Sequence, residues 1–202
     1  LVAVVQRQEV DQTAHFAQRF DVIFERTIRD RRLLGVSRGT AKFLGCHSIR
    51  VNAGGPGNKE ELAKQVIDGL TRLSTFAKGF GINVIVENHG GLSSDGAWLS
   101  GVLKKINMEN CGALPDFGNF HGYDRYQGIK DLMPYAKGVS AKSHKFNDKG
   151  DEVKTDYLKA MQLVAAAGYK GYVGIEYEGS QLSEHDGIIA TKELLERVFT
   201  QI

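Results

Sequence analysis

Ile82-Asn-Val-Ile-Val-Glu87 is followed by the polar loop Asn88-His-Gly-Gly-Leu-Ser-Ser94 and then by a stretch, Trp98 to Ile106, in which apolar residues recur three or four positions apart. The first segment is short and rich in β-branched residues, which predicts a buried strand. The periodic stretch predicts a helix. A strand, a Gly-containing loop and a helix in this order predict a βα unit, the building block of a parallel sheet.

The same order recurs about every 30 residues from residue 45 onward. Four more strands are predicted at 46–52, 111–116, 138–144 and 172–176, and four more helices are predicted to begin near residues 58, 126, 155 and 184. Five successive βα units predict an α/β protein, either an open doubly wound sheet or part of a (β/α)₈ barrel. In both folds the functional groups gather at the carboxyl ends of the strands.

The composition is that of an ordinary globular protein, with 202 residues, 42% hydrophobic and 25% charged. The net charge of +2 gives no reason to expect nucleic acid or a membrane surface as a partner. No apolar run approaches the ~20 residues of a membrane span. Cys46 and Cys111 are expected to be buried, reduced thiols, and Leu1–Val5 is too short for a signal-peptide core, which together favour a cytoplasmic protein.

The basic residues are unevenly distributed along the chain. Residues 1–38 contain seven arginines and no lysine, whereas residues 39–202 contain four arginines and fifteen lysines. We therefore expect residues 1–40 to form an atypical segment, either frame-shifted or foreign, with a basic arm as the alternative. Within this segment only Val2–Val5 is predicted to form a strand. Residues 41–202 carry the five predicted βα units.

Three acidic residues, Glu87, Asp116 and Glu176, each occupy the last position of a predicted strand. Strand ends of a parallel sheet share one face of the molecule, so these carboxylates are predicted to converge. Because like charges repel, the pattern favours a divalent cation among them. The alternative is three unrelated helix caps or surface charges.

Other polar residues lie near the same predicted strand ends. His89, His121 and His144 are candidates for a fourth metal ligand. Lys142 shares a strand face with His144 and points either toward the carboxylates or toward the helix layer. Arg50 and Asn52 share a face of the first strand and are candidates for binding a polyol.

The strand-end motifs lie at residues 45–54, 86–91, 114–120, 139–142 and 174–179. In this order they resemble the xylose isomerase-like TIM-barrel family, which includes sugar and sugar-phosphate isomerases and epimerases. The resemblance covers about residues 41–202. It implies a TIM-type (β/α)₈ barrel with a divalent ion, Mn²⁺, Co²⁺, Mg²⁺ or Zn²⁺, at its carboxyl-terminal mouth.

By this resemblance the metal ligands are two glutamates, an aspartate and a histidine. Carried over by motif, they are Glu87, Asp116, Glu176 and, as the candidate histidine, His144. His144 is only a candidate because alignment on Lys142 places Ser140 at the family's histidine. The two glutamates are also the implied catalytic residues, which exchange a proton through a cis-enediolate. The expected substrate-binding residues are Arg50, Asn52, Asn88, His89, Asn119 and Lys142.

These expectations make the chain a divalent-metal-dependent isomerase or epimerase of a small carbohydrate, with no nucleic-acid or membrane partner and with homo-oligomerisation left open. The motif order assigns the five units to the last five of eight, so a partial barrel is expected. That shortfall supports two alternatives. One is a truncated, non-catalytic barrel remnant or assembly partner, and the other is a keto-sugar lyase on the same scaffold.

Overall fold

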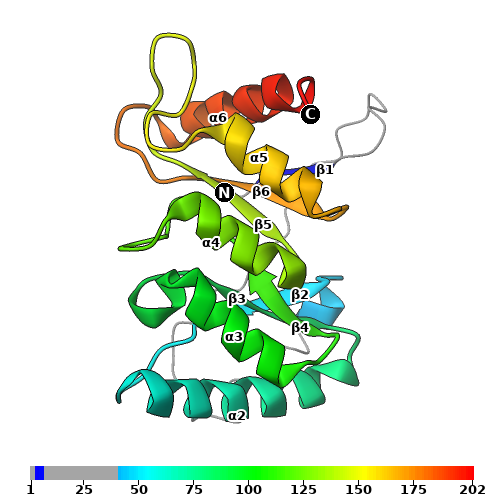
Figure 1. Ribbon diagram of the computed structural model, residues 1–202. Coiled ribbons are helices and arrows are strands. Elements are labelled where there is room, and N and C mark those ends of the chain that lie inside the picture. The colour runs from blue at the N-terminus through cyan, green and yellow to red at the C-terminus, as the bar shows by residue number, and fades with distance from the viewer. Residues whose placement is uncertain (1–2, 7–40) are drawn as a thin grey trace.

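The computed structural model of the protein describes residues 3–6 and 41–202 (Figure 1). Five βα pairs follow one another in it: β2 (Ser48–Val51), α2 (Lys59–Lys78), β3 (Asn83–Glu87), α3 (Gly96–Ile106), β4 (Cys111–Leu114), α4 (Arg125–Leu132), β5 (Val139–Ser143), α5 (Tyr157–Ala166), β6 (Tyr172–Tyr177) and α6 (Glu184–Phe199). The 3₁₀ segments η1 (Gly91–Ser94) and η2 (Met133–Tyr135) precede α3 and follow α4. The five predicted units are confirmed, and their strand boundaries and helix starts lie within two residues of the predicted ones.

The parallel strands follow one another in chain order. β2, β3 and β4 form one ladder and β5 pairs with β6. Isolated bridges from Ala113 to Ala136 and from Asp116 to Ser140 join the β4 end to β5. The helices lie on one side of this strand arc, and each contacts the next along the chain (Figure 1). A doubly wound sheet would reverse its strand order and place helices on both faces, so the arrangement is that of a partial TIM-type barrel.

A sixth strand, β1 (Ala3–Gln6), pairs with β6 in the antiparallel direction. Ala3 lies opposite Ile175 and Gln6 lies opposite Tyr172. The predicted strand at Val2–Val5 is thus present, displaced by one residue. The rest of the prediction for residues 1–40 lies outside the described residues.

The helix starts follow from local side-chain hydrogen bonds. Asn58 accepts from the backbone N–H groups of Glu60 and Glu61, and the Glu61 carboxylate accepts from the Asn58 N–H at 3.1 Å, which completes a capping box. The apolar stripe of α2, from Leu62 to Ala77, is buried against the strands and α3. This packing fixes the outer layer and leaves the strand ends to form the site.

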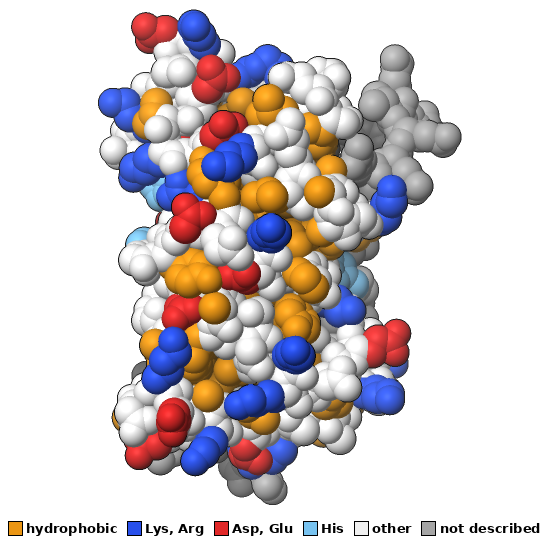
Figure 2. All heavy atoms as spheres, in the orientation of Figure 1, with side chains coloured by type: hydrophobic (Ala, Val, Ile, Leu, Met, Phe, Trp, Pro, Cys, Tyr) orange, Lys and Arg blue, Asp and Glu red, His pale blue; other side chains and the backbone are white. Residues whose placement is uncertain are grey.

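The helix layer carries both signs of charge. On the face seen in Figure 2, Lys and Arg side chains are interspersed with Asp, Glu and apolar side chains. Among the described residues no helix combines the length and the apolar character that crossing a membrane requires.

Candidate functional site

Three carboxylates meet at the carboxyl ends of the strands. Glu87 ends β3, Asp116 lies two residues beyond β4, and Glu176 lies near the end of β6. Each offers an oxygen, and these oxygens all lie within 4.8 Å of one another. Glu87 and Asp116 are buried, whereas the Glu176 side chain is 33% exposed and faces solvent. We call these three residues the carboxylate group; their convergence is the arrangement that the strand ends predict.

Asp116 is held by its neighbours through its backbone and one carboxylate oxygen. The Asn88 amide donates to the Asp116 carbonyl at 3.0 Å and accepts from the Asp116 N–H at 2.7 Å. The Gly118 N–H donates to Asp116 Oδ1 at 2.8 Å. Asp116 Oδ2 is buried and has no hydrogen-bond partner among the described residues. A buried carboxylate oxygen without a hydrogen-bond partner, in a residue that converges with two more carboxylates, fits a divalent cation, which binds such oxygens directly.

Two basic side chains share the space with the carboxylates. Arg50 Nε lies 2.5 Å from Glu87 Oε2. Lys142 Nζ lies 3.1 Å from Glu176 Oε1 and 3.0 Å from an oxygen of Glu178. Lys142 is only 1% exposed, so it points toward the carboxylates and not toward the helix layer. The two cations offset part of the negative charge that the acidic side chains bring together.

Lys142 has room for its side chain because residue 118 is glycine. A Cβ on Gly118 would lie 2.7 Å from Lys142 Cδ. Asn119 then links the two sides of the site, since its Nδ2 donates to Glu87 Oε1 at 2.8 Å and its Oδ1 accepts from Lys142 Nζ at 3.4 Å. The Tyr157 hydroxyl donates to the Lys142 carbonyl at 2.9 Å and fixes the backbone of β5.

Burial dominates the protonation of the acidic residues. It raises the pKa of the Asp116 carboxyl to about 8, against the opposing effect of Lys142 and with a further contribution from Glu176. Burial also raises the pKa of Glu87, although Arg50 opposes the shift. Burial alone would lower the pKa of Lys142, but Asp116 and Glu176 outweigh it and the pKa rises. Burial therefore favours the protonated form of Asp116 in the absence of a metal, and a bound cation would favour the release of that proton.

The structure does not bring every sequence candidate into the carboxylate group. His144 follows β5 directly, and its backbone N–H donates to Glu152 at 3.3 Å. Burial and, next, Lys154 lower the pKa of the His144 imidazole. Ser140, the residue aligned with the family's histidine, donates to Glu176 Oε2 at 2.9 Å instead. Three of the candidates are exposed: Asn52, His89 and His121. The side-chain amide of Asn88 is hydrogen-bonded to the Asp116 backbone.

Two acidic residues of this region were missed in the sequence. Glu178 contacts Lys142, and strand alternation would have found it, because it lies two residues after Glu176 and so shares its face. Glu152 is buried and accepts from the backbone N–H groups of His144, Lys145, Lys154 and Thr155, which ties the β5–α5 loop to the strand end. These hydrogen bonds depend on the conformation of the β5–α5 loop, which the sequence does not indicate.

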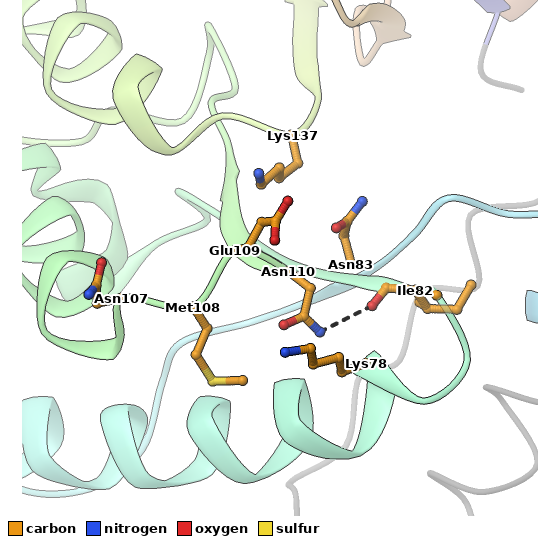
Figure 3. Close-up of a pocket in the computed structure, with 9 residues that line it drawn as sticks. Lys78, Ile82, Asn83, Asn107, Met108, Glu109, Asn110 and Lys137 are labelled. Atoms are coloured by element: carbon orange, nitrogen blue, oxygen red, sulfur yellow. Dashed lines mark hydrogen bonds between the residues drawn. The ribbon is translucent and has the colours of Figure 1, made fainter.

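A pocket of about 450 Å³ lies at the opposite ends of the strands (Figure 3). Lys78, Asn83, Glu109 and Lys137 line it, and the Asn110 amide donates across it to the Ile82 carbonyl at 3.4 Å. Among its described lining residues there is no member of the carboxylate group. In a (β/α) barrel the amino-terminal end of the strands serves stability, so we place the functional site at the carboxylates.

The family model described as "Xylose isomerase-like TIM barrel" matches residues 25–198 of the sequence. The chain belongs to the xylose isomerase-like TIM barrel family. The match begins inside the segment 1–40 and covers all five βα units. No curated protein matches the sequence.

Solved structures share the fold at low sequence identity. A xylose isomerase-like TIM barrel protein from Mycobacterium smegmatis, solved with magnesium, is 16% identical over 86% of this chain and 70% of its own, with a TM-score of 0.67. The IOLI protein with a bound zinc atom is 18% identical over 84% and 69%, with a TM-score of 0.65. A sugar phosphate isomerase/epimerase from Parabacteroides distasonis is 14% identical over 82% and 62%, with a TM-score of 0.67. Other matching structures bear the names of an epimerase and of an AP endonuclease, so the fold hosts more than one chemistry.

Proposed function

We propose that the protein is a divalent-metal-dependent isomerase or epimerase of a sugar or sugar phosphate. The observation that carries the proposal is the convergence of one carboxylate oxygen each from Glu87, Asp116 and Glu176 within 4.8 Å, together with a buried Oδ2 of Asp116 that has no hydrogen-bond partner among the described residues. Family membership and the neighbouring structures solved with magnesium and with zinc support a cation at this place. The donor set is made of carboxylate oxygens, which suit Mg²⁺ and Mn²⁺ better than softer ions.

Glu87, Asp116 and Glu176 would hold the cation, which when bound polarises a substrate carbonyl and acidifies the neighbouring C–H. The Glu176 side chain is 33% exposed, so a substrate that enters from solvent reaches it first, and Glu87 lies beside it in the carboxylate group. Glu176 removes the carbon-bound proton, and Glu87 returns a proton to the opposite face or to the adjacent carbon. Burial raises the pKa of the Glu87 carboxyl, which favours the protonated form that it needs in order to return a proton.

The surrounding polar groups orient the substrate and the two glutamates. Lys142 and Asn119 lie between the glutamates and would donate to substrate hydroxyl oxygens once a substrate replaces one of their present acceptors. Arg50 holds Glu87 at 2.5 Å, and Ser140 holds Glu176 at 2.9 Å. A hydroxyl at position 140 supplies a hydrogen bond to the base, where the family's histidine would supply a metal ligand.

The proposal is tested by measuring Mn²⁺ binding by calorimetry and solvent deuterium incorporation into ketoses by NMR. Glu176→Gln is expected to weaken Mn²⁺ binding and to abolish deuterium incorporation next to the carbonyl, because the amide is a poor ligand and no base. Glu196→Gln is the matched control, since Glu196 pairs with Lys192 on the surface of α6. Unchanged Mn²⁺ binding in Glu176→Gln, or equal losses in both variants, would refute the site.

A further inference from the structure

The Lys142 ammonium already pairs with a carboxylate oxygen of Glu176, one of the residues that a divalent cation would use. It lies 3.1 Å from Glu176 Oε1, 3.0 Å from Glu178 Oε2 and 3.4 Å from Asn119 Oδ1, and it is buried. Of these partners Glu176 belongs to the carboxylate group. An ammonium and a divalent cation bound to the same carboxylate oxygen repel each other strongly where water is excluded.

Every oxygen of the two glutamates in the group has a partner. Glu176 Oε1 contacts Lys142, and Glu176 Oε2 accepts from Ser140. Glu87 Oε1 accepts from Asn119, and Glu87 Oε2 contacts Arg50. A cation that binds Asp116 and Glu176 would therefore share a Glu176 oxygen with Ser140 or Lys142, and of these two partners Lys142 carries the same sign of charge as the cation.

Glu178 offers Lys142 a second carboxylate. It follows Glu176 by two residues, its oxygen is as close to the ammonium as that of Glu176, and its side chain is 51% exposed. Its position beyond the carboxylate group lets the ammonium keep one charged partner after it releases Glu176. Without Glu178, release would leave a buried ammonium with Asn119 as its remaining partner among the described residues.

We propose that Lys142 is an internal cation that holds the carboxylate group in the metal-free protein and moves onto Glu178 when a divalent cation binds. Glu178 is then a positioning residue that sets the metal affinity without ligating the metal. This inference rests on the proposed metal centre, and it describes how a divalent cation and the Lys142 ammonium exchange there. It also separates two ways in which Glu178 affects a cation: as the acceptor of Lys142 or as a distant negative charge.

A double-mutant cycle with Mn²⁺, followed by the electron paramagnetic resonance signal of the free ion, distinguishes these two ways. Lys142→Met is expected to tighten Mn²⁺ binding, because the competitor is gone. Glu178→Gln is expected to weaken it about tenfold, which corresponds to about 1.4 kcal/mol. In the Lys142→Met background, Glu178→Gln is expected to change the affinity less than about twofold, whereas a distant charge would act equally in both backgrounds. Glu193→Gln, an exposed residue on α6, is the charge control.

The outcomes separate this inference from the proposed function. If neither the wild-type protein nor Lys142→Met binds Mn²⁺, the proposed metal centre itself is refuted. If both bind with equal affinity, or if Glu178→Gln has the same effect in both backgrounds, only the exchange is overturned. If Lys142→Met does not fold, the Lys142 ammonium resonance of the wild-type protein is followed by NMR during a Mg²⁺ titration. The resonance is expected to shift at saturation because the ammonium moves. An unchanged resonance overturns the exchange.

Discussion

Asp116→Asn is expected to stabilise the metal-free protein at alkaline pH while weakening its metal binding. Burial raises the pKa of the Asp116 carboxyl from 3.8 to about 8, so between these pH values the folded protein holds a proton that the unfolded chain has lost. Stability therefore falls as the pH rises from about 4 to about 8. At about 1.4 kcal/mol for each pH unit between the two pKa values, full ionisation costs on the order of 5 kcal/mol.

The asparagine removes this cost because it has the same shape and no charge. Its Oδ1 can keep the 2.8 Å hydrogen bond from the Gly118 N–H, and its Nδ2 replaces the unpartnered Oδ2 with a donor in a site that holds two more carboxylates. The variant should exceed the wild-type protein in stability by several kcal/mol at about pH 9 and by much less at about pH 5. The same substitution deletes a metal ligand.

Urea unfolding followed by circular dichroism measures both effects, at the two pH values with EDTA and at neutral pH with Mn²⁺. At a Mn²⁺ concentration of 100 times its Kd, the wild-type protein should gain about 2.7 kcal/mol, and the variant should gain less. Asp148→Asn, at an exposed position, is the control and should leave both quantities unchanged. The reasoning is refuted if Asp116→Asn is the less stable protein in EDTA at both pH values, or if it keeps the full gain from Mn²⁺.

Four further substitutions at three positions test the packing and the helix starts, each by urea unfolding. Gly128→Ala should cost about 1–3 kcal/mol, because an added Cβ would overlap the Phe120 ring between α4 and the β4–α4 loop. Gly101→Ala, in α3, should instead stabilise by about 0.5–1 kcal/mol, because the described residues leave open space there; losses at both glycines would contradict the packing argument. Asn58→Ala should cost about 1 kcal/mol through loss of the capping box, while Asn58→Asp should keep most of it.

The βα units were predictable because periodicity, caps and glycines agreed at each of them. The strand at 111–116 illustrates the limit of that reasoning. β4 ends at Leu114 because Pro115 has no N–H to give to the ladder, and Asp116 returns only as an isolated bridge to Ser140. The sequence contained this signal, and a strict application of the proline rule would have moved the boundary.

The site was predictable to the level of strand ends and no further. Alternation along β5 allowed Lys142 either of two faces, and the choice depends on Gly118, a residue of a neighbouring loop that leaves room for the side chain. The role of Asn88 depends on the register of β3 against β4, which brings its amide to the backbone of Asp116. Such contacts are set by tertiary packing, so a single sequence does not reveal them.

The charge balance of the site explains why Glu178 belongs in its description. Glu87, Asp116 and Glu176 alone are almost neutralised by Arg50 and Lys142, and a divalent cation added to them would leave an excess of positive charge. With Glu178 counted, four carboxylates face two cations, and one divalent cation brings the whole to neutrality. Without the metal, protonation of Asp116 reduces the same imbalance, as its raised pKa requires. Glu178, which lies inside the 174–179 motif but was not among the predicted site residues, is thus the residue that makes this site suited to a doubly charged ion.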